Sequence, residues 1–248
     1  MNKLSVVIIT KNESKNIKDC LESVKWADEI VVVDSGSTDN TVDLAKQYTN
    51  KVIYNEWKGF AEQKYFAVSQ ATNEWILSLD ADERITDKLK QEIINLDENI
   101  ADGFEIKRDN FFFGKKIRGS GWGNDFQMRL FRKSKVSVNN RLVHEKFLVE
   151  GKVAKLKNSI LHYSYTNFED AFDKINLYST LEAIEKKNKK KVNAFTIILT
   201  PLITFIQPFI FKKGFIDGVH GILISLLNAY TKTQVMMKIW ELKRKEQL

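Results

Sequence analysis

Hydrophobic and polar positions follow two periods over the first hundred residues. Buried strands are predicted at short, β-branched apolar runs: residues 4–10, 29–34, 51–54 and 75–79. Helices are predicted where apolar residues recur at steps of three and four: residues 14–24, 41–48, 60–71 and 86–96. Strands that alternate with helices in this way predict a mainly parallel sheet with helices on both faces.

The pattern changes after residue 100. Four further strands are predicted, with no clear helix among them: residues 103–113, 126–133, 142–149 and 153–165. A long helix over 167–187 ends in a lysine-rich segment, and twenty residues without a formal charge follow at 192–211. A second mostly apolar helical stretch occupies 215–240. We therefore expect one α/β domain over 1–166, with halves 1–100 and 101–166, and a helical extension over 167–248.

The distribution of charge separates the two parts of the chain. Residues 1–100 hold 12 Lys and Arg against 18 Asp and Glu, whereas the remainder holds 27 against 14. The acidic part suits a metal ion, and the basic part suits phosphates or an anionic membrane surface. The single cysteine, Cys20, excludes a disulfide framework and a multi-cysteine zinc site, and favours a reducing compartment.

Polar residues gather where the predicted strands end, which is where parallel sheets bind ligands. Asp80 and Asp82 follow a buried strand, and both can turn toward one Mg²⁺ or Mn²⁺, since these ions prefer oxygen ligands. A solvated turn is the alternative. Asp34 also ends a buried strand and can accept a base N–H or a ribose hydroxyl. For Asp39 we favour a helix cap.

These strand ends carry a family resemblance. The segments Val6–Glu13, Val31–Asp39 and Leu77–Glu83 together resemble the inverting family 2 glycosyltransferases of GT-A fold. Later segments are similar to one branch, the lipopolysaccharide core-type glucosyltransferases: residues 59–64, 129–132, 143–145 and 214–218. The resemblance implies a GT-A, Rossmann-like catalytic domain over 1–166. Its first half would bind the nucleotide and its second half the acceptor.

The resemblance also implies a nucleotide-sugar donor, with UDP as the expected nucleotide. The residues that would line the nucleoside pocket are Thr10, Asn12, Glu13 and Asp34. Lys64 would reach the base or the diphosphate. Asp80 and Asp82 would hold the nucleotide through ribose and Mg²⁺ or Mn²⁺, with Asp82 preferred as the direct ligand. A divalent cation and nearby basic side chains would stabilise the charge on the departing diphosphate.

An inverting transfer needs a base that takes the proton of the acceptor hydroxyl. We prefer Glu145, because the similar branch carries a His-Glu pair after its Arg-Leu-Phe-Arg strand, and Asp125 is the alternative. His144 would orient the base, contact phosphate, or serve as an ordinary strand histidine.

Two arginines and one tryptophan are further candidates. Arg129 and Arg132 lie three apart on a predicted strand, so they face opposite sides and only one is expected to reach phosphate. We assign Arg132 to the donor and Arg129 to the acceptor or a phosphate. Trp122 would stack on a sugar ring or pack in the core. His162 and His220 are isolated in the sequence and carry little signal.

The uncharged segment 192–211 has about the length of a membrane span. Pro201 and Pro208 are expected to break a helix there, threonines dilute its apolar character, and lysines flank both ends. We therefore expect interfacial helices with lysines on lipid headgroups. Packing on the catalytic domain or a dimer contact is the alternative.

Together these features predict transfer of a hexose, with glucose favoured by the resemblance, from a UDP-sugar to a membrane glycolipid such as lipopolysaccharide core. The expected location is the inner face of the cell membrane, an oligomer is possible, and no nucleic acid partner is expected. A nucleotidyltransferase would show a glycine-rich phosphate loop near the first strand, and residues 10–14 contain no glycine. A non-catalytic membrane- or nucleic-acid-binding module would not need Asp34, Asp80 and Asp82 at successive strand ends.

Overall fold

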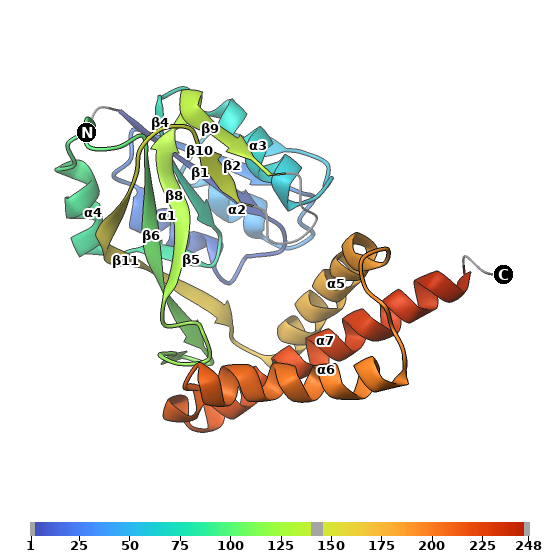
Figure 1. Cartoon of the computed structure of the whole chain (residues 1–248). Helices are drawn as coiled ribbons and strands as arrows, with labels where there is room; N and C mark the ends of the chain where they lie inside the picture. Colours follow the sequence, from blue (N-terminus) through green and yellow to red (C-terminus); the bar gives the residue numbers. More distant parts are fainter. Residues whose placement is uncertain (1–2, 140–145, 246–248) are drawn as a thin grey trace. The chain divides into compact units, whose positions relative to one another are not determined.

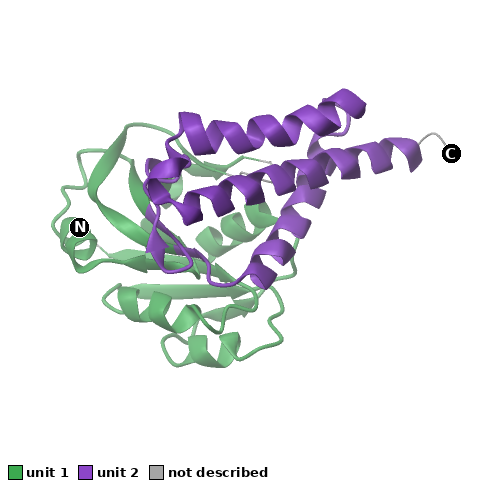
Figure 2. Cartoon of the chain, turned by 90° about the horizontal axis from the view of Figure 1, so that it is seen from below, with its two compact units in different colours: residues 1–108, 126–140, 144–162 green, residues 109–125, 141–143, 163–248 purple. Residues whose placement is uncertain are grey.

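A computed structural model of the chain describes residues 3–139 and 146–245. It divides into two compact units, coloured separately in Figure 2. Unit 1 comprises residues 1–108, 126–140 and 144–162, and unit 2 comprises residues 109–125, 141–143 and 163–248. The predicted roles of His144 and Glu145 fall on residues outside the described ranges, so both stay predictions.

The main sheet runs in the order β3-β2-β1-β4-β8-β6-β11-β5, with β7 paired to the end of β6 (Figure 1). Its strands are β1 (Leu4–Thr10), β2 (Glu29–Asp34), β3 (Val52–Tyr54), β4 (Trp75–Asp80), β5 (Glu83–Ile85), β6 (Gly103–Phe112), β7 (Lys115–Lys116), β8 (Asp125–Arg132) and β11 (Val153–Tyr165). The first four strands pair in parallel, whereas β8 runs antiparallel to β4 and β5 antiparallel to β11. The mainly parallel sheet that the sequence predicts is confirmed.

Alternate side chains of the central strands fill two apolar layers, one on each face of the sheet. Val6 and Ile8 lie on the face covered by α1 (Ile17–Val24), α2 (Thr41–Lys46) and α4 (Asp87–Ile94). Val7 lies on the opposite face, under α3 (Phe60–Gln70) and the small hairpin of β9 (Val136–Val138) and β10 (Phe147–Val149). Because both faces are covered, the strands consist almost entirely of apolar residues up to their carboxyl ends.

Two turns at the carboxyl ends of β1 and β2 depend on short polar side chains. Asn12 adopts a left-handed backbone with φ of 53°, which asparagine tolerates, and its Oδ1 accepts the Thr38 N–H at 2.8 Å. Asp39 accepts the Thr41 N–H at 3.0 Å and the Ser14 N–H at 3.1 Å. The N-cap of α2 is Asn40 and not Asp39 as expected; Asp39 holds the first turn of α2 from one residue earlier and also ties the two loops together.

Unit 2 contains the helices α5 (Phe168–Lys186), α6 (Ala194–Ile206) and α7 (Val219–Lys245). Two short segments join α6 to α7: the π-helical η2 (Gln207–Phe211) and the 3₁₀-helical η3 (Gly214–Asp217).

The hairpin loop after β6 packs on the junction between η2 and η3. Buried Asp217 accepts the backbone N–H groups of Arg118 at 3.1 Å and Gly119 at 2.7 Å. A Cβ at Gly119 would lie 2.2 Å from the Lys213 carbonyl oxygen, so only glycine fits. The segment 214–218 therefore has a structural role in unit 2.

The expectation that two prolines break the apolar segment is wrong. Pro201 lies inside α6, and Pro208 lies in the first turn of η2, so helical structure continues from Ala194 to Phe211. Helix α6 continues on both sides of Pro201, and at Pro208 the wider π turn changes the spacing of the backbone hydrogen bonds where proline lacks an N–H. By length and composition this stretch is able to cross a membrane, with a mean hydropathy of 1.9.

The Asp39 contacts predict how stability depends on pH. Burial raises the pKa of Asp39, but hydrogen bonds from Thr41 and Ser14 outweigh it and lower the pKa from 3.8 to about 2. Because the folded-state pKa is below the unfolded one, this carboxylate stabilises the fold above about pH 4, and the contribution is lost as pH falls from about 4 to 2.

We expect Asp39→Asn to lower the free energy of unfolding near pH 6 and to flatten its decline between about pH 4 and 2. Urea unfolding at a series of pH values measures both effects. Exposed Asp43, on the same helix, provides the control: Asp43→Asn should retain the wild-type decline. An equally steep decline in Asp39→Asn would contradict this role.

Candidate active site

The carboxyl ends of three adjacent strands bring the predicted acidic residues to one edge of the sheet. Strand β1 lies between β2 and β4, with Thr10 opposite Asp34 and Ile9 opposite Asp80. Neighbouring strands are about 4.8 Å apart, so the ends of β2 and β4 are separated by only about 10 Å. The strand pairing therefore places Asp34 and Asp80 on either side of Thr10, as the sequence predicts.

Asp80 lies between two cations. Its Oδ2 accepts a hydrogen bond from Arg129 Nη2 at 2.6 Å, and its Oδ1 lies 3.4 Å from Lys64 Nζ. Lys64 comes from α3, and Arg129 comes from β8 on the same face of the sheet. Burial raises the pKa of Asp80, but Arg129 and Lys64 outweigh it and hold the pKa well below its usual range. Asp80 is therefore ionised at neutral pH.

Glu83 is a second carboxylate in the same cluster and is fully buried. Its Oε1 accepts from Arg129 Nη2 at 2.6 Å and lies 3.5 Å from Arg108 Nη1, while its Oε2 accepts the Asp80 N–H at 3.0 Å. Glu83 therefore closes the turn after β4 and balances two arginines. The Arg129 pKa is raised above its usual value, because Asp80 and Glu83 outweigh the effect of its burial.

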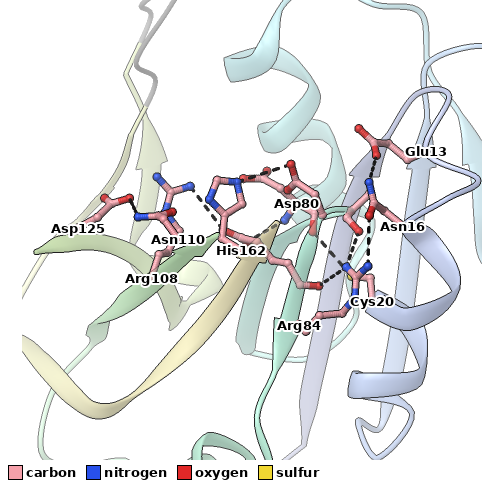
Figure 3. Close-up of polar contacts among 12 residues, drawn as sticks. Glu13, Asn16, Cys20, Asp80, Arg84, Arg108, Asn110, Asp125 and His162 are labelled. Carbon is pink, nitrogen blue, oxygen red and sulfur yellow. Dashed lines mark hydrogen bonds and ion pairs between the residues drawn. The ribbon is translucent and has the colours of Figure 1, made fainter. Parts of the chain in front are cut away.

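Asp82 projects to a different partner. Its Oδ2 lies 3.5 Å from His162 Nε2, and His162 pairs with Glu83 in the antiparallel ladder of β11 and β5. His162 is separated from Asp82 by eighty residues, and neither its neighbours nor its spacing in the sequence identifies it as a site residue. The sequence also gives no signal for Arg108. Figure 3 shows His162 and Arg108 at this edge with Asp80.

The loop after β1 is tied to the turn after β4 by Arg84. Its guanidinium donates to the Ala81 carbonyl oxygen at 3.1 Å and to Asn16 Oδ1 at 3.3 Å, and Asn16 in turn donates to Glu13 Oε2 at 2.8 Å (Figure 3). Glu13 also donates its backbone N–H to Thr41 Oγ1 at 2.8 Å. The predicted nucleoside residue Glu13 is therefore held in place by two other loops.

Asp34 and Thr10 differ in whether their side-chain oxygens already have hydrogen-bond partners. Asp34 Oδ2 accepts the N–H groups of Gly36 at 2.8 Å and Ser37 at 2.9 Å, so this carboxylate shapes its own turn. The buried Thr10 hydroxyl has no hydrogen-bond partner within residues 3–139 and 146–245. A buried hydroxyl of this kind is usually satisfied by water or a ligand.

Gln63 is a site residue that the sequence does not single out. It is fully buried beside Lys64 and donates to Ser35 Oγ at 2.8 Å, while its Oε1 accepts from Asn55 at 2.7 Å. Gln63 thereby fixes the start of α3 against the ends of β2 and β3. Gly59 precedes this helix with φ of 115°, a conformation that side-chain-bearing residues rarely adopt.

Arg132 does not join the cluster, and its assignment to the donor is not supported by its position. It pairs with Trp75 at the start of β4, five residues and about 17 Å of strand from Asp80. Its guanidinium lies 4.7 Å from the centre of the Trp75 ring and donates to the Glu98 carbonyl oxygen at 3.0 Å. Of the two arginines, Arg129 reaches Asp80, because β8 runs antiparallel to β4.

Two other candidates lie in unit 2. Trp122 packs against the apolar cluster around Phe112, which supports its reading as a core aromatic. Asp125 accepts a hydrogen bond from Asn110 Nδ2 at 3.2 Å and begins β8 (Figure 3). Its predicted alternative role as base stays a prediction.

The chemistry of the cluster fits a divalent cation. Within the described ranges, no group of three or more His, Cys, Asp or Glu side chains surrounds a single position. A carboxylate and an imidazole, from Asp82 and His162, nevertheless face each other, and substrate oxygens commonly complete the shell of Mg²⁺ or Mn²⁺. The three cations Lys64, Arg108 and Arg129 are formally balanced by Asp80, Asp82 and Glu83. An added cation would therefore supply the positive charge that a diphosphate requires.

A mainly parallel α/β sheet that gathers carboxylates and cations at its carboxyl edge is the arrangement of a GT-A glycosyltransferase. Residues 5–146 match the family model described as Glycosyl transferase family 2. The chain belongs to this family and is a glycosyltransferase.

Relatives cover nearly the whole chain. An uncharacterized glycosyltransferase of Rickettsia prowazekii is 32% identical, over 100% of this chain and 90% of that protein. The lipopolysaccharide core biosynthesis glycosyltransferase LpsC of Rhizobium meliloti is 31% identical, over 91% of this chain and 90% of LpsC. The crystal structure of S. aureus TarS 1–349 in complex with UDP covers 98% of this chain and 92% of that chain, with a TM-score of 0.50 and 17% identity. This last comparison shows the fold alone.

Because Arg129 is shared by two carboxylates, we expect its substitution to lower the free energy of unfolding more than substitution of Arg132 on the same strand. Arg129→Leu leaves buried Glu83 and Asp80 without their common cation, and we expect a loss of about 3–5 kcal/mol in the free energy of unfolding. Arg132→Leu removes a partly exposed stacking contact and should cost about 1 kcal/mol. Urea unfolding of both variants near pH 7 measures the difference. Equal losses would show that the Asp80–Arg129–Glu83 cluster does not stabilise the fold.

Proposed function

We propose that the protein transfers a hexose from a UDP-sugar, with inversion, to a lipid-linked saccharide acceptor such as lipopolysaccharide core. The observation that carries the donor half of this proposal is the convergence of Lys64, Arg129 and Arg108 on the carboxylates at the end of β4. The relation to LpsC along most of both chains supports the acceptor class. Glucose as the sugar rests on the sequence resemblance.

The nucleoside would lie over the ends of β1 and β2. Thr10 has a buried hydroxyl still able to bond a ligand, and Asp34 lies directly opposite it in the ladder. Asn12 and Glu13 are fixed in the adjoining loop by the contacts described above. The UDP present in the TarS crystal structure, which shares this fold, supports UDP as the nucleotide.

The diphosphate would lie beside Asp80, where Lys64 and Arg129 supply N–H donors and a bound divalent cation would supply the net positive charge. Arg129 Nε is buried and has no hydrogen-bond partner among the described residues, so the guanidinium has donor capacity left. We propose that Asp82 and His162 hold Mg²⁺ or Mn²⁺, which when bound supplies a Lewis acid for the leaving diphosphate. Preorganised cations stabilise charge where it develops, which is their main effect on rate.

Donor binding provides a first test. We expect UDP with Mn²⁺ to raise the melting temperature by several degrees at saturation, since a ligand at 100 times its Kd adds about 2.7 kcal/mol. Asp82→Asn should keep the wild-type melting temperature without ligand, lose the Mn²⁺-dependent part of the shift, and lower the transfer rate at least about 100-fold. Activity near the wild-type level in Asp82→Asn would contradict the proposed metal role.

The acceptor base is tested by two matched variants. We propose Glu145 as the group that takes the acceptor proton, with His144 orienting it, and Asp125 as the alternative. Glu145→Gln should bind UDP normally and transfer sugar about 10²–10⁴-fold more slowly. Asp125→Asn should bind and transfer nearly as the wild type does. The reverse result, measured by release of free UDP with acceptor present, would assign the base to Asp125.

A lipid-linked acceptor implies that the reaction takes place at a membrane surface. We propose the cytoplasmic face, because a chain whose single cysteine, Cys20, is buried and unpaired has no disulfide framework and so suits a reducing compartment.

A further inference from the structure

Helix α6 and η2 present a continuous apolar face to solvent. The exposed side chains recur at steps of one, three and four residues along one side: Phe195, Ile198, Leu202, Ile203, Ile206, Ile210 and Phe211. Phe195 is 69% exposed, Ile198 68% and Phe211 77%. The helix contacts α7 within unit 2, and its remaining side chains from Thr196 to Phe205 are half-buried. An exposed apolar stripe of this extent marks a surface that contacts a partner.

The charged side chains of the segment that carries this stripe all have one sign. Residues 186–216 contain seven lysines and no Asp or Glu. Lys189, Lys190 and Lys191 precede the helix, and Lys212 and Lys213 follow it, and all five are exposed. The basic segment before α6 is joined to α7 by a hydrogen bond from Lys243 Nζ to the Lys190 carbonyl oxygen at 2.7 Å. Apolar residues between two basic ends are complementary to lipid tails and anionic headgroups.

The contacts of α7 argue for a helix that lies along the bilayer surface. Lys232 of α7 is ion-paired with Glu182 of α5 at 2.6 Å, and Lys238 donates to three side-chain oxygens and one carbonyl oxygen of α5. If α6 crossed the bilayer while packed on α7, these charged groups would enter the hydrocarbon region at high cost. A helix lying flat keeps both basic ends at headgroup level.

A second copy of the chain fits this face less well. Any pairing of α6 with α6 of another copy would bring the lysines of one end against lysines of the partner. Residues 186–216 offer no carboxylate to compensate for that repulsion. An anionic bilayer supplies the missing negative charge.

We propose that the exposed face of α6 and η2 is a membrane-docking surface, which binds an anionic bilayer with its apolar residues in the interface and its flanking lysines on the headgroups. This inference is independent of the donor and acceptor chemistry proposed above, because vesicles without any saccharide are expected to bind.

The test is co-sedimentation of the full-length protein with vesicles of phosphatidylcholine, alone or with phosphatidylglycerol. We expect binding that requires phosphatidylglycerol and weakens with added salt. Ile198→Asp/Leu202→Asp should lower the partition coefficient at least tenfold, and Lys212→Glu/Lys213→Glu should lower it by a similar factor. Circular dichroism and the melting temperature verify that each variant is folded.

Matched controls carry the same chemical changes at exposed positions of unit 1. Ile100→Asp/Leu148→Asp places two carboxylates at exposed apolar residues, and Lys88→Glu/Lys157→Glu reverses two exposed lysines. Both controls should bind vesicles within about twofold of the wild type. An equal loss in a control and its matched variant would overturn the docking surface, because net charge alone would then explain binding.

Three further outcomes distinguish a bilayer surface from a second copy of the chain and from a transmembrane helix. Absence of wild-type binding to anionic vesicles overturns the proposal. A wild-type dimer in light scattering that Ile198→Asp/Leu202→Asp dissociates, without vesicle binding, assigns the face to a second copy. Extraction of vesicle-bound protein by alkaline carbonate supports a surface helix, whereas resistance to extraction would show a transmembrane one.

Discussion

One buried arginine shared by two carboxylates organises the catalytic edge of this protein. Arg129 lies 2.6 Å from both Asp80 and Glu83, and both Arg129 and Glu83 are almost completely removed from solvent. Such ions are costly to bury and stabilise a fold only when their partners are in place. Glu83 also accepts the Asp80 N–H, so the same cluster fixes the backbone of the turn. The direction of Asp82, which follows Asp80 by two residues, depends on that turn.

The acidic residues at this edge divide into separate roles. Asp80 is neutralised by protein cations, Asp82 faces an imidazole, and Asp34 and Asp39 hold the loops that would surround a nucleoside. Each role follows from the strand on which the residue lies and from what the opposite strand supplies. A family 2 glycosyltransferase needs a donor site of this kind, in which charge is arranged before the substrate arrives.

The elements of the sheet could be predicted because their signals are local. The predicted strand 4–10 corresponds to β1, and the helix predicted from residue 86 corresponds to α4, which Thr86 caps. His162 and Arg108 could not be predicted as site residues, because they reach the cluster through strands that return from later in the chain. Which of Arg129 and Arg132 reaches Asp80 depends on the antiparallel direction of β8 relative to β4. The local sequence pattern does not indicate that direction. The local rule that proline breaks a helix gave the wrong result at Pro201, because α6 continues on both sides of it.

The most direct test is a crystal structure with UDP and Mn²⁺ in which anomalous scattering locates the metal. We predict one manganese within about 2.0–2.3 Å of an Asp82 oxygen, in contact with diphosphate oxygens beside Lys64 and Arg129. Nucleotide bound away from the carboxyl ends of β1, β2 and β4, or manganese without Asp82 as a ligand, would contradict it.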